Sequence, residues 1–214
     1  MTRNLLVDKP YVEIGGVKWA TMNIGAETET DYGLYFSWGD TAGYTSGQCG
    51  DKTVAYKKPF YEYAYTFNGG RATSNESGLT KYNRSDRKIV LDESDDAAVA
   101  NWGGDWRMPT TAEFYALGEA VNTAWTADYQ GSGVSGLVCT DKTDSSKTLF
   151  FPLGGMCSGG SFRGGSFGYY WSSSLNTTDM VNAFIFYLDN SHVYWDRWFS
   201  YRFNGCSIRP VLGS

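Results

Sequence analysis

Apolar residues alternate with polar ones in several short segments of the chain, and a period of two is typical of strands. The first two segments, Tyr11–Ile14 and Val17–Ala20, flank a Gly15-Gly16 pair and predict a hairpin. Tyr35–Trp38 is another short apolar segment. Later strands, separated by Gly and Ser, are expected at Gly136–Thr140, Thr148–Pro152, Tyr169–Ser173, Ala183–Leu188, His192–Trp195 and Ser207–Val211.

A first helix is expected to begin at Ser94, because serine is a favourable N-cap residue. Asp95 and Asp96 would then lie in the first turn, where carboxylates complement the helix dipole. The run Ala97–Ala100 continues the helix, and Gly103-Gly104 is expected to end it.

A second helix is expected where Thr110 and Glu113 can form a capping box. Phe114, Leu117 and Val121 then share one face of that helix. Two helices followed by a run of strands indicate an α+β fold.

The stretch from residue 40 to residue 88 is polar and rich in Gly, with no steady period of 2 or 3.6. We interpret it as a loop-rich, ordered insertion in a single domain that spans residues 1–214. Short elements are expected inside it, because a structureless loop of this length is unusual in a domain. Aromatic anchors are expected at Tyr61, Tyr63, Tyr65 and Phe67.

Charge and hydropathy argue against two classes of function. The net charge is −5 at pH 7 and no run of Lys and Arg is present, so nucleic-acid binding is not expected. No apolar stretch approaches the roughly 18 residues needed to span a membrane, so membrane insertion is not expected either. Met1–Pro10 lacks an apolar core of signal-peptide length. Either the chain is not exported by that route or its leader has been removed.

Four cysteines, Cys49, Cys139, Cys157 and Cys206, are too far apart to form a CxxC pair. We expect buried or partly buried thiols, with one or two disulfides as the alternative. No metal site or cofactor is expected, because His192 is the only histidine and carboxylates do not cluster with the cysteines.

Catalytic residues are not expected. Nucleophilic catalysis needs a base beside the nucleophile, and the single histidine lies in an irregular segment. Arg107, Glu113 and Arg209 are interpreted as structural residues. Glu113 caps its helix, and the two arginines tie loops to backbone carbonyls.

Along residues 182–195, large apolar residues alternate with residues of mixed chemistry, and in a strand the two sets point to opposite faces. Residues 197–201 show no clear period and are expected to form a loop. The apolar set is expected to face the core and consists of Phe184, Phe186, Leu188, Val193 and Trp195.

The mixed set is expected to face outward and to contact a ligand. It consists of Ile185, Tyr187, Asp189, His192, Tyr194, Asp196, Arg197, Trp198, Phe199 and Tyr201. Tyr and Trp provide rigid contact area in antibody paratopes, and Trp, Tyr and Arg are enriched at interface hot spots. Two aspartates balance Arg197 and Arg202, which argues against a phosphate-rich ligand and leaves protein or glycan open. The alternative is that these aromatics fill the core.

Six blocks of the sequence, in order along nearly the whole chain, match a known pattern. The most specific block, Asn101–Phe114, contains WGGDWRMPTTAEF. The others are Val17–Ala26, Asp31–Gly39, Asp95–Ala98, Gly168–Ser173 and Ser207–Val211. Together they resemble a large Bacteroidetes family, the Fibrobacter succinogenes major paralogous domain, with its signatures WGGxWRxPTxxEF, VKWAxxNxGA and YGxYFxWG.

This resemblance implies a C-type-lectin-like fold, in a variant similar to formylglycine-generating enzymes, with two short helices, several short antiparallel strands and long ordered loops. Arg163–Phe167 resembles the RGGSW block of those enzymes. The C-terminal layout also resembles the variable proteins of diversity-generating retroelements, in which adenine-directed mutagenesis rewrites codons near the end of the gene. By this resemblance, residues 182–204 are the variable ligand-binding segment.

Two activities of related folds fit less well. The formylglycine-generating type of oxidase needs a close pair of cysteines near the C-terminus, and Cys157 and Cys206 are far apart in sequence. Calcium-dependent lectins use Glu-Pro-Asn or Gln-Pro-Asp followed by Trp-Asn-Asp, and these motifs are absent.

The sequence therefore predicts a non-catalytic display protein that binds a protein or glycan on a cell surface. The resemblance places it outside the cell, on a bacterial surface or a phage virion. An invariant adhesin or scaffold of the same family is the first alternative, and an oxidase is the second. The sequence leaves open whether the chain forms a homo-oligomer.

Overall fold

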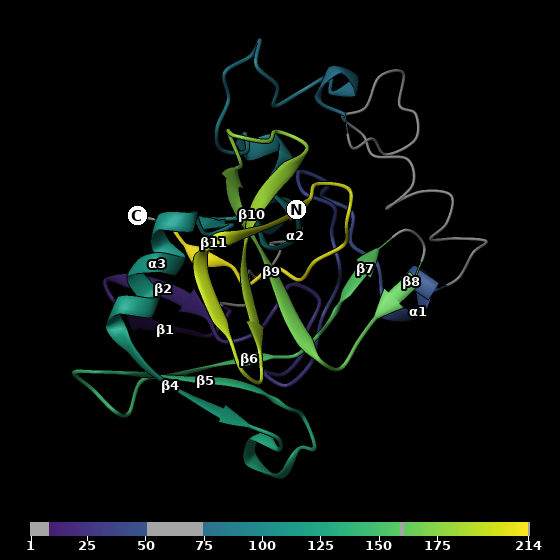
Figure 1. The fold of residues 1–214 in the computed structure, drawn as a ribbon. Helices are drawn as coiled ribbons and strands as arrows, with labels where there is room; N and C mark the ends of the chain where they lie inside the picture. The colour runs from purple at the N-terminus through teal and green to yellow at the C-terminus, as the bar shows by residue number, and fades with distance from the viewer. Residues whose placement is uncertain (1–8, 51–74, 159–160, 214) are drawn as a thin grey trace, which may run out of the picture.

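The computed structural model describes residues 9–50, 75–158 and 161–213 and has an α+β architecture of short antiparallel strands with few helices (Figure 1). The α-helices are α1 (Ser46–Gly50), α2 (Ala97–Trp102) and α3 (Thr111–Ala120). Short 3-10 helices are η2 (Glu76–Gly78), η3 (Glu93–Asp95) and η4 (Tyr129–Gly131). The strands are β1 (Tyr11–Ile14), β2 (Val17–Ala20), β3 (Trp106–Arg107), β4 (Val121–Thr126), β5 (Gly136–Asp141), β6 (Thr148–Pro152), β7 (Met156–Ser158), β8 (Ser161–Arg163), β9 (Phe167–Leu175), β10 (Asn182–Asp189), β11 (Val193–Tyr201) and β12 (Val211–Leu212).

Helix α1 and the 3-10 helix η2 are short elements of the kind expected inside the 40–88 insertion, although the sequence did not give their positions. The aromatic anchors expected in that insertion, Tyr61, Tyr63, Tyr65 and Phe67, fall outside the described residues. Within the part of the chain that the structure describes, no helix is long and apolar enough to cross a membrane.

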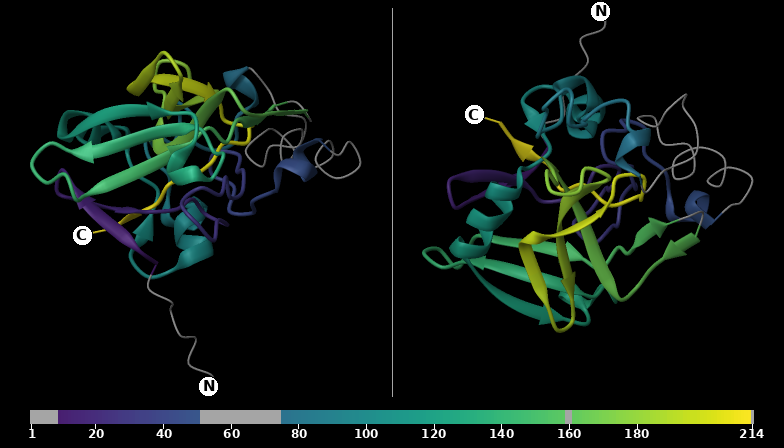
Figure 2. Two further views of the ribbon diagram at one scale, coloured as in Figure 1. Left: turned by 90° about the horizontal axis from the view of Figure 1, so that it is seen from below. Right: turned by 45° about the horizontal axis from the view of Figure 1, so that its top comes forward.

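The strands of the described residues form four sheets, ordered β1-β2-β12-β3, β11-β10-β9, β4-β5-β6 and β7-β8. Strand β12, near the C-terminus, lies between β2 and β3, because Val211 pairs with Trp19 of β2 and with Arg107 of β3 (Figure 2). The buried Arg209 strengthens this arrangement by donating hydrogen bonds to the carbonyls of Ala20, Thr21 and Phe150. The structural role expected for Arg209 is confirmed.

The start of α3 is as expected from the sequence. The Thr110 side chain accepts a hydrogen bond from the Glu113 backbone, and Glu113 accepts one from the backbone of Thr110, which completes the capping box. Phe114 and Leu117 are buried on one face of the helix. Arg107 contacts the carbonyl of Met108, as expected, but it also forms an ion pair with Glu113.

The predicted start of α2 was wrong. Asp96, not Ser94, is the N-cap, and its carboxylate accepts hydrogen bonds from the backbone of Ala98 and Val99. The same carboxylate accepts a hydrogen bond from the backbone of Met108 at 2.8 Å, a contact between distant segments. Residues 93–95 form η3 instead of the first helical turn. Gly103 ends the helix with a positive φ of 68°, as expected.

The late strands are present, and apart from β6 their bounds differ from the prediction. Residues 197–201, expected to form a loop, belong to β11. Only Val211 of the expected strand Ser207–Val211 enters a named strand, while Ser207 forms an isolated bridge with Tyr170. Strands β3, β4, β7 and β8 were not predicted.

Both faces of the β9-β10-β11 sheet pack against apolar clusters. On one face, Ile185 and Trp171 belong to a core with residues of α2 and of the segment around Phe36. On the other face, Phe186 and Tyr170 belong to a second core that includes the buried face of α3. Figure 1 shows α3 beside this sheet. The sheet is therefore the central layer between two cores.

A disulfide links Cys49, in α1, to Cys157, in β7. The expectation of free thiols is wrong for this pair, and the alternative of one disulfide is correct. Cys139 and Cys206 are free and buried. The bond ties the start of the insertion to the β7-β8 hairpin, a pairing that a sequence separation of 108 residues does not reveal.

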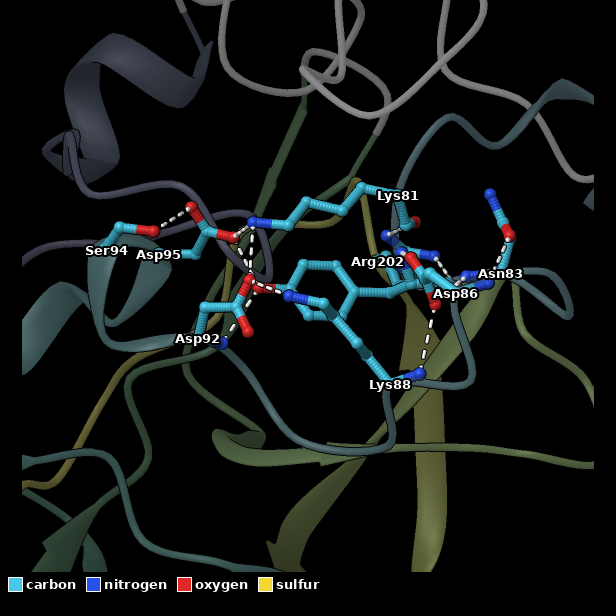
Figure 3. A network of polar contacts seen from close by, with 9 residues as sticks. Lys81, Asn83, Asp86, Lys88, Asp92, Ser94, Asp95 and Arg202 are labelled. Carbon is cyan, nitrogen blue, oxygen red and sulfur yellow. Dashed lines mark hydrogen bonds and ion pairs between the residues drawn. The ribbon is translucent and has the colours of Figure 1, made fainter.

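The end of β11 is anchored by the buried Arg202. Its guanidinium donates hydrogen bonds to the carbonyls of Lys81, Tyr82 and Met180, and it lies over the ring of Trp38 at 5.0 Å. Beside it, Lys81 forms ion pairs with two carboxylates of the next segment, as Figure 3 shows. This polar network fixes where β11 ends, and so where the exposed residues of that strand lie.

Candidate ligand-binding surface

Asp189 organises the turn between β10 and β11. Its carboxylate accepts hydrogen bonds from the backbone N–H groups of Ser191 and His192, each at 2.7 Å. It also accepts one from the hydroxyl of Tyr187 at 2.8 Å and lies 3.2 Å from Nδ1 of His192. Burial raises the pKa of Asp189, but these hydrogen bonds outweigh it and hold the pKa below the usual value. The charged carboxylate therefore fixes both the turn and two neighbouring aromatic side chains.

Four side chains gather beyond this turn, and we refer to them as the aromatic cluster: Tyr187, His192, Tyr194 and Trp198. The rings of Tyr194 and Trp198 are stacked, with centroids 5.0 Å apart and planes 8° apart. The His192 ring also stacks on Tyr194, with centroids 5.8 Å apart, and the centroids of Tyr187 and Trp198 are 5.5 Å apart. The rings of His192, Tyr194 and Trp198 are thus nearly parallel to one another, and Tyr187 lies tilted against Trp198.

A bulge in β11 produces this arrangement. Tyr187 pairs with Tyr194 and Ile185 pairs with Trp198, so a step of two residues in β10 stands opposite a step of four in β11. Extra residues in one strand bend it and redirect its side chains. Because directly paired residues share a face, Tyr194 and Trp198 point to the same side as Tyr187.

The structure brings together four of the ten residues predicted to contact a ligand, with Asp189 bonded to two of them. Trp198 is 43% exposed, a large value for tryptophan, while Tyr187 and Tyr194 are half-buried. Asp196 and Arg197 lie within the bulge, 3.8 Å apart, and Arg197 is well exposed.

The outward orientation predicted for Ile185 was wrong. Ile185 is 1% exposed and packs in the core with Trp171. The alternation of apolar and mixed residues distinguished the two faces of β10 correctly, but both faces are covered along its middle. On the same face as Ile185, the neighbouring strand exposes Trp198, and the aromatic cluster lies from there toward the turn.

Phe199 and Tyr201 do not join the aromatic cluster. Phe199 pairs with Phe184 and Tyr201 pairs with Asn182, which places both on the opposite face from Trp198. Both side chains are exposed, and the ring of Tyr201 stacks on Phe203 at 5.1 Å. The predicted surface therefore divides into two parts on opposite faces of β11.

Tyr169 was missed by the sequence analysis. It pairs with Tyr187 across β9 and β10, and the two rings meet edge to face at 5.1 Å. It supports the aromatic cluster from the next strand. Tyr169 stands in a run of three aromatics, Tyr169–Trp171, and its sequence neighbours Tyr170 and Trp171 are fully buried. Nothing in the run distinguishes Tyr169 from these two core residues.

The two free thiols, Cys139 and Cys206, are buried. Burial raises the pKa of Cys139 and of Cys206, so both are held as protonated thiols. Among the described residues, no group of three or more His, Cys, Asp and Glu side chains is placed to hold a metal ion. The aromatic cluster, with the Asp189 carboxylate fixed beside it, is therefore the arrangement best suited to contact a ligand.

A scan against protein-family models finds none that matches this chain, and comparisons with curated proteins and with solved structures find no match either.

Proposed function

We propose that this protein is a non-catalytic, C-type-lectin-like binding protein whose aromatic cluster contacts a protein or glycan on a cell surface. The observation that carries the proposal is the stack of the exposed Trp198 on the half-buried Tyr194, with Tyr187 packed against Trp198. Aromatic side chains with few rotatable bonds lose little entropy on binding, and Trp and Tyr dominate interface hot spots.

The fixed geometry of the cluster supports binding. Tyr187 is held by its bond to Asp189, and His192 by its contacts with the same carboxylate. Side chains that are already ordered in the free protein do not pay that ordering cost again when a ligand binds.

The six blocks that resemble the Fibrobacter succinogenes family support the proposed fold because they supply buried residues. Trp19, Trp38 and Trp171 come from three different blocks and are fully buried, as is Arg209 from the last. The resemblance thus rests on residues that build the cores, while the aromatic cluster lies outside the blocks. A constant scaffold with a distinct contact surface is the arrangement that the proposed display role requires.

Alanine variants test the proposal. Tyr194→Ala and Trp198→Ala are expected to abolish most of the binding of the labelled protein to a panel of Bacteroidetes cells. Phe199→Ala, on the opposite face of β11, removes an exposed ring outside the aromatic cluster and leaves the stack of Tyr194 and Trp198 intact. Trp125→Ala is the matched control, since Trp125 is also exposed, at 38%, but lies in β4 of another sheet. Equal losses in all four variants would contradict the proposal.

Diversification by a retroelement is a second part of the proposal, and the resemblance alone supports it. It predicts a near-copy of the DNA encoding residues 182–204 close to the gene, differing mainly where the copy has adenine. Sequencing the flanking DNA decides it. Absence of the copy would leave the alternative of an invariant surface adhesin, with the binding role of the aromatic cluster unchanged.

A further inference from the structure

A pocket of about 360 Å³ opens where the β7-β8 hairpin approaches the start of β10 and the end of β11. Its wall includes Arg163, Tyr169, Asp179, Asn182, Tyr201 and Asn204. Tyr169 joins the pocket to the cluster, because its ring also packs against Tyr187. Tyr169 is thus the residue that the pocket and the aromatic cluster have in common.

Asn204 has a buried polar atom without a partner. The residue is 6% exposed, and its Nδ2 donates a hydrogen bond to the Ser200 hydroxyl at 3.0 Å. Its Oδ1 accepts no hydrogen bond from any residue that the structure describes. A buried acceptor left unsatisfied is costly, and such atoms are rare in folded proteins.

Exchanging the oxygen and nitrogen of this carboxamide does not remove the problem. A hydroxyl both donates and accepts, so Ser200 can pair with either atom, and the other atom still lacks a partner. Whichever way the Asn204 carboxamide is oriented, its unpaired atom can be satisfied by a group that can both donate and accept a hydrogen bond. A ligand hydroxyl has this property.

The charges around the pocket favour a neutral ligand. Arg163 contributes one positive charge and Asp179 one negative charge, and Asp179 also accepts a hydrogen bond from Asn182 at 2.8 Å. The wall therefore has no net charge to attract an anion or a cation. The aromatic rings of Tyr169 and Tyr201 add flat apolar surface, whose negative face attracts the C–H groups of a saturated ring.

We propose that this pocket binds one neutral sugar ring of a surface glycan, with a ring hydroxyl paired to Asn204. This assignment rests on the proposed function, since it names the class of cell-surface ligand, at a pocket that shares Tyr169 with the aromatic cluster. The volume lies at the small end of the range for ligand pockets, which suits a ring better than a folded protein surface. Protein recognition would need a much larger contact area, of about 800 Å².

Saturation-transfer NMR with the methyl glycosides of glucose, galactose, mannose and N-acetylglucosamine tests this assignment. At least one glycoside is expected to bind the wild-type protein. Asn204→Ala is expected to weaken that binding about tenfold, the effect of losing one good hydrogen bond. Tyr201→Ala, at an exposed position, is expected to weaken it too and serves if Asn204→Ala does not fold. Trp125→Ala should bind as the wild type does.

The sugar assignment is wrong if no glycoside binds, or if Asn204→Ala and Tyr201→Ala bind as tightly as the wild type. It is also wrong if cell binding survives periodate oxidation of surface sugars and is lost after protease treatment of the cells. In each case, a loss of cell binding in Trp198→Ala would leave the proposed function standing. If Trp198→Ala binds cells normally while the glycosides bind the pocket, the proposed function of the aromatic cluster fails and the sugar site remains.

Discussion

Two neighbouring residues of β10 show how far alternation predicts exposure. Ile185 and Phe186 point to opposite faces, yet both are buried, because each face of the sheet packs against its own core. Three residues further on, Asp189 lies at the turn and is only partly buried. The sequence predicts which residues share a face. It does not predict which part of a face is covered, since that depends on segments far away in the chain.

Ile185 and Trp198 pair directly but are expected to respond differently to truncation. Ile185→Ala leaves a cavity in the core and should lower the free energy of unfolding by about 2–5 kcal/mol. Trp198→Ala removes an exposed ring and should change it by less than about 1 kcal/mol. Urea denaturation measures both. A larger loss for Trp198→Ala would mean that the aromatic cluster holds the fold.

Asp189 is expected to make the free energy of unfolding depend on pH. Because its pKa is lowered in the folded protein, it contributes stability above the ordinary aspartate pKa of about 3.9. That contribution is lost as the pH falls through the lowered folded pKa. Asp189→Asn should therefore be less stable than the wild type at pH 7, and the gap should narrow below pH 4. Denaturation midpoints over pH 2.5–7 show whether the gap changes; a constant gap would exclude this role for the charge.

The elements that the sequence predicted best are those whose signals are local. The β1-β2 hairpin and β6 have the predicted bounds, and the capping box of α3 is where expected. β11 was predicted too short because its bulge breaks the period of two. β4 was missed because most of its residues are exposed and polar or small, so no apolar alternation marks it.

The contact between α3 and β11 depends on Gly118, which is unfavourable in a helix by intrinsic propensity. A Cβ at this position would lie 2.7 Å from the indole of Trp195, which itself stacks on Phe186 at 4.5 Å. Gly118→Ala is therefore expected to destabilise the protein by about 1–3 kcal/mol, through forced repacking of Trp195.

The control is Ala112→Gly, at an exposed position of the same helix. Helix propensity alone predicts that Ala112→Gly lowers the free energy of unfolding by about 1 kcal/mol. The same propensity predicts that Gly118→Ala would raise it by about 1 kcal/mol. Chemical denaturation of both variants separates the two effects. A gain in stability for Gly118→Ala would show that the helix does not approach β11 this closely.

For the whole molecule, the features that define the candidate site come from contacts between distant segments. Arg202 reaches the carbonyls of residues 81 and 82 and fixes the end of β11, and Cys49 bonds to Cys157 beside the pocket. The sequence pattern identifies the aromatic residues but places them on one continuous surface. The bulge and the second core separate them into the aromatic cluster, the opposite pair Phe199 and Tyr201, and the buried Ile185.

The contact role of the aromatic cluster can be tested by comparing two single variants, Trp198→Ala and Trp125→Ala, for binding to the same cells at equal folded concentration. Both remove an exposed tryptophan from a strand, but only Trp198 stacks on Tyr194. We predict that Trp198→Ala binds at least about tenfold more weakly, the loss expected for a hot-spot aromatic. Trp125→Ala should bind as the wild type does. Equal binding by the two variants would contradict a contact role for the aromatic cluster.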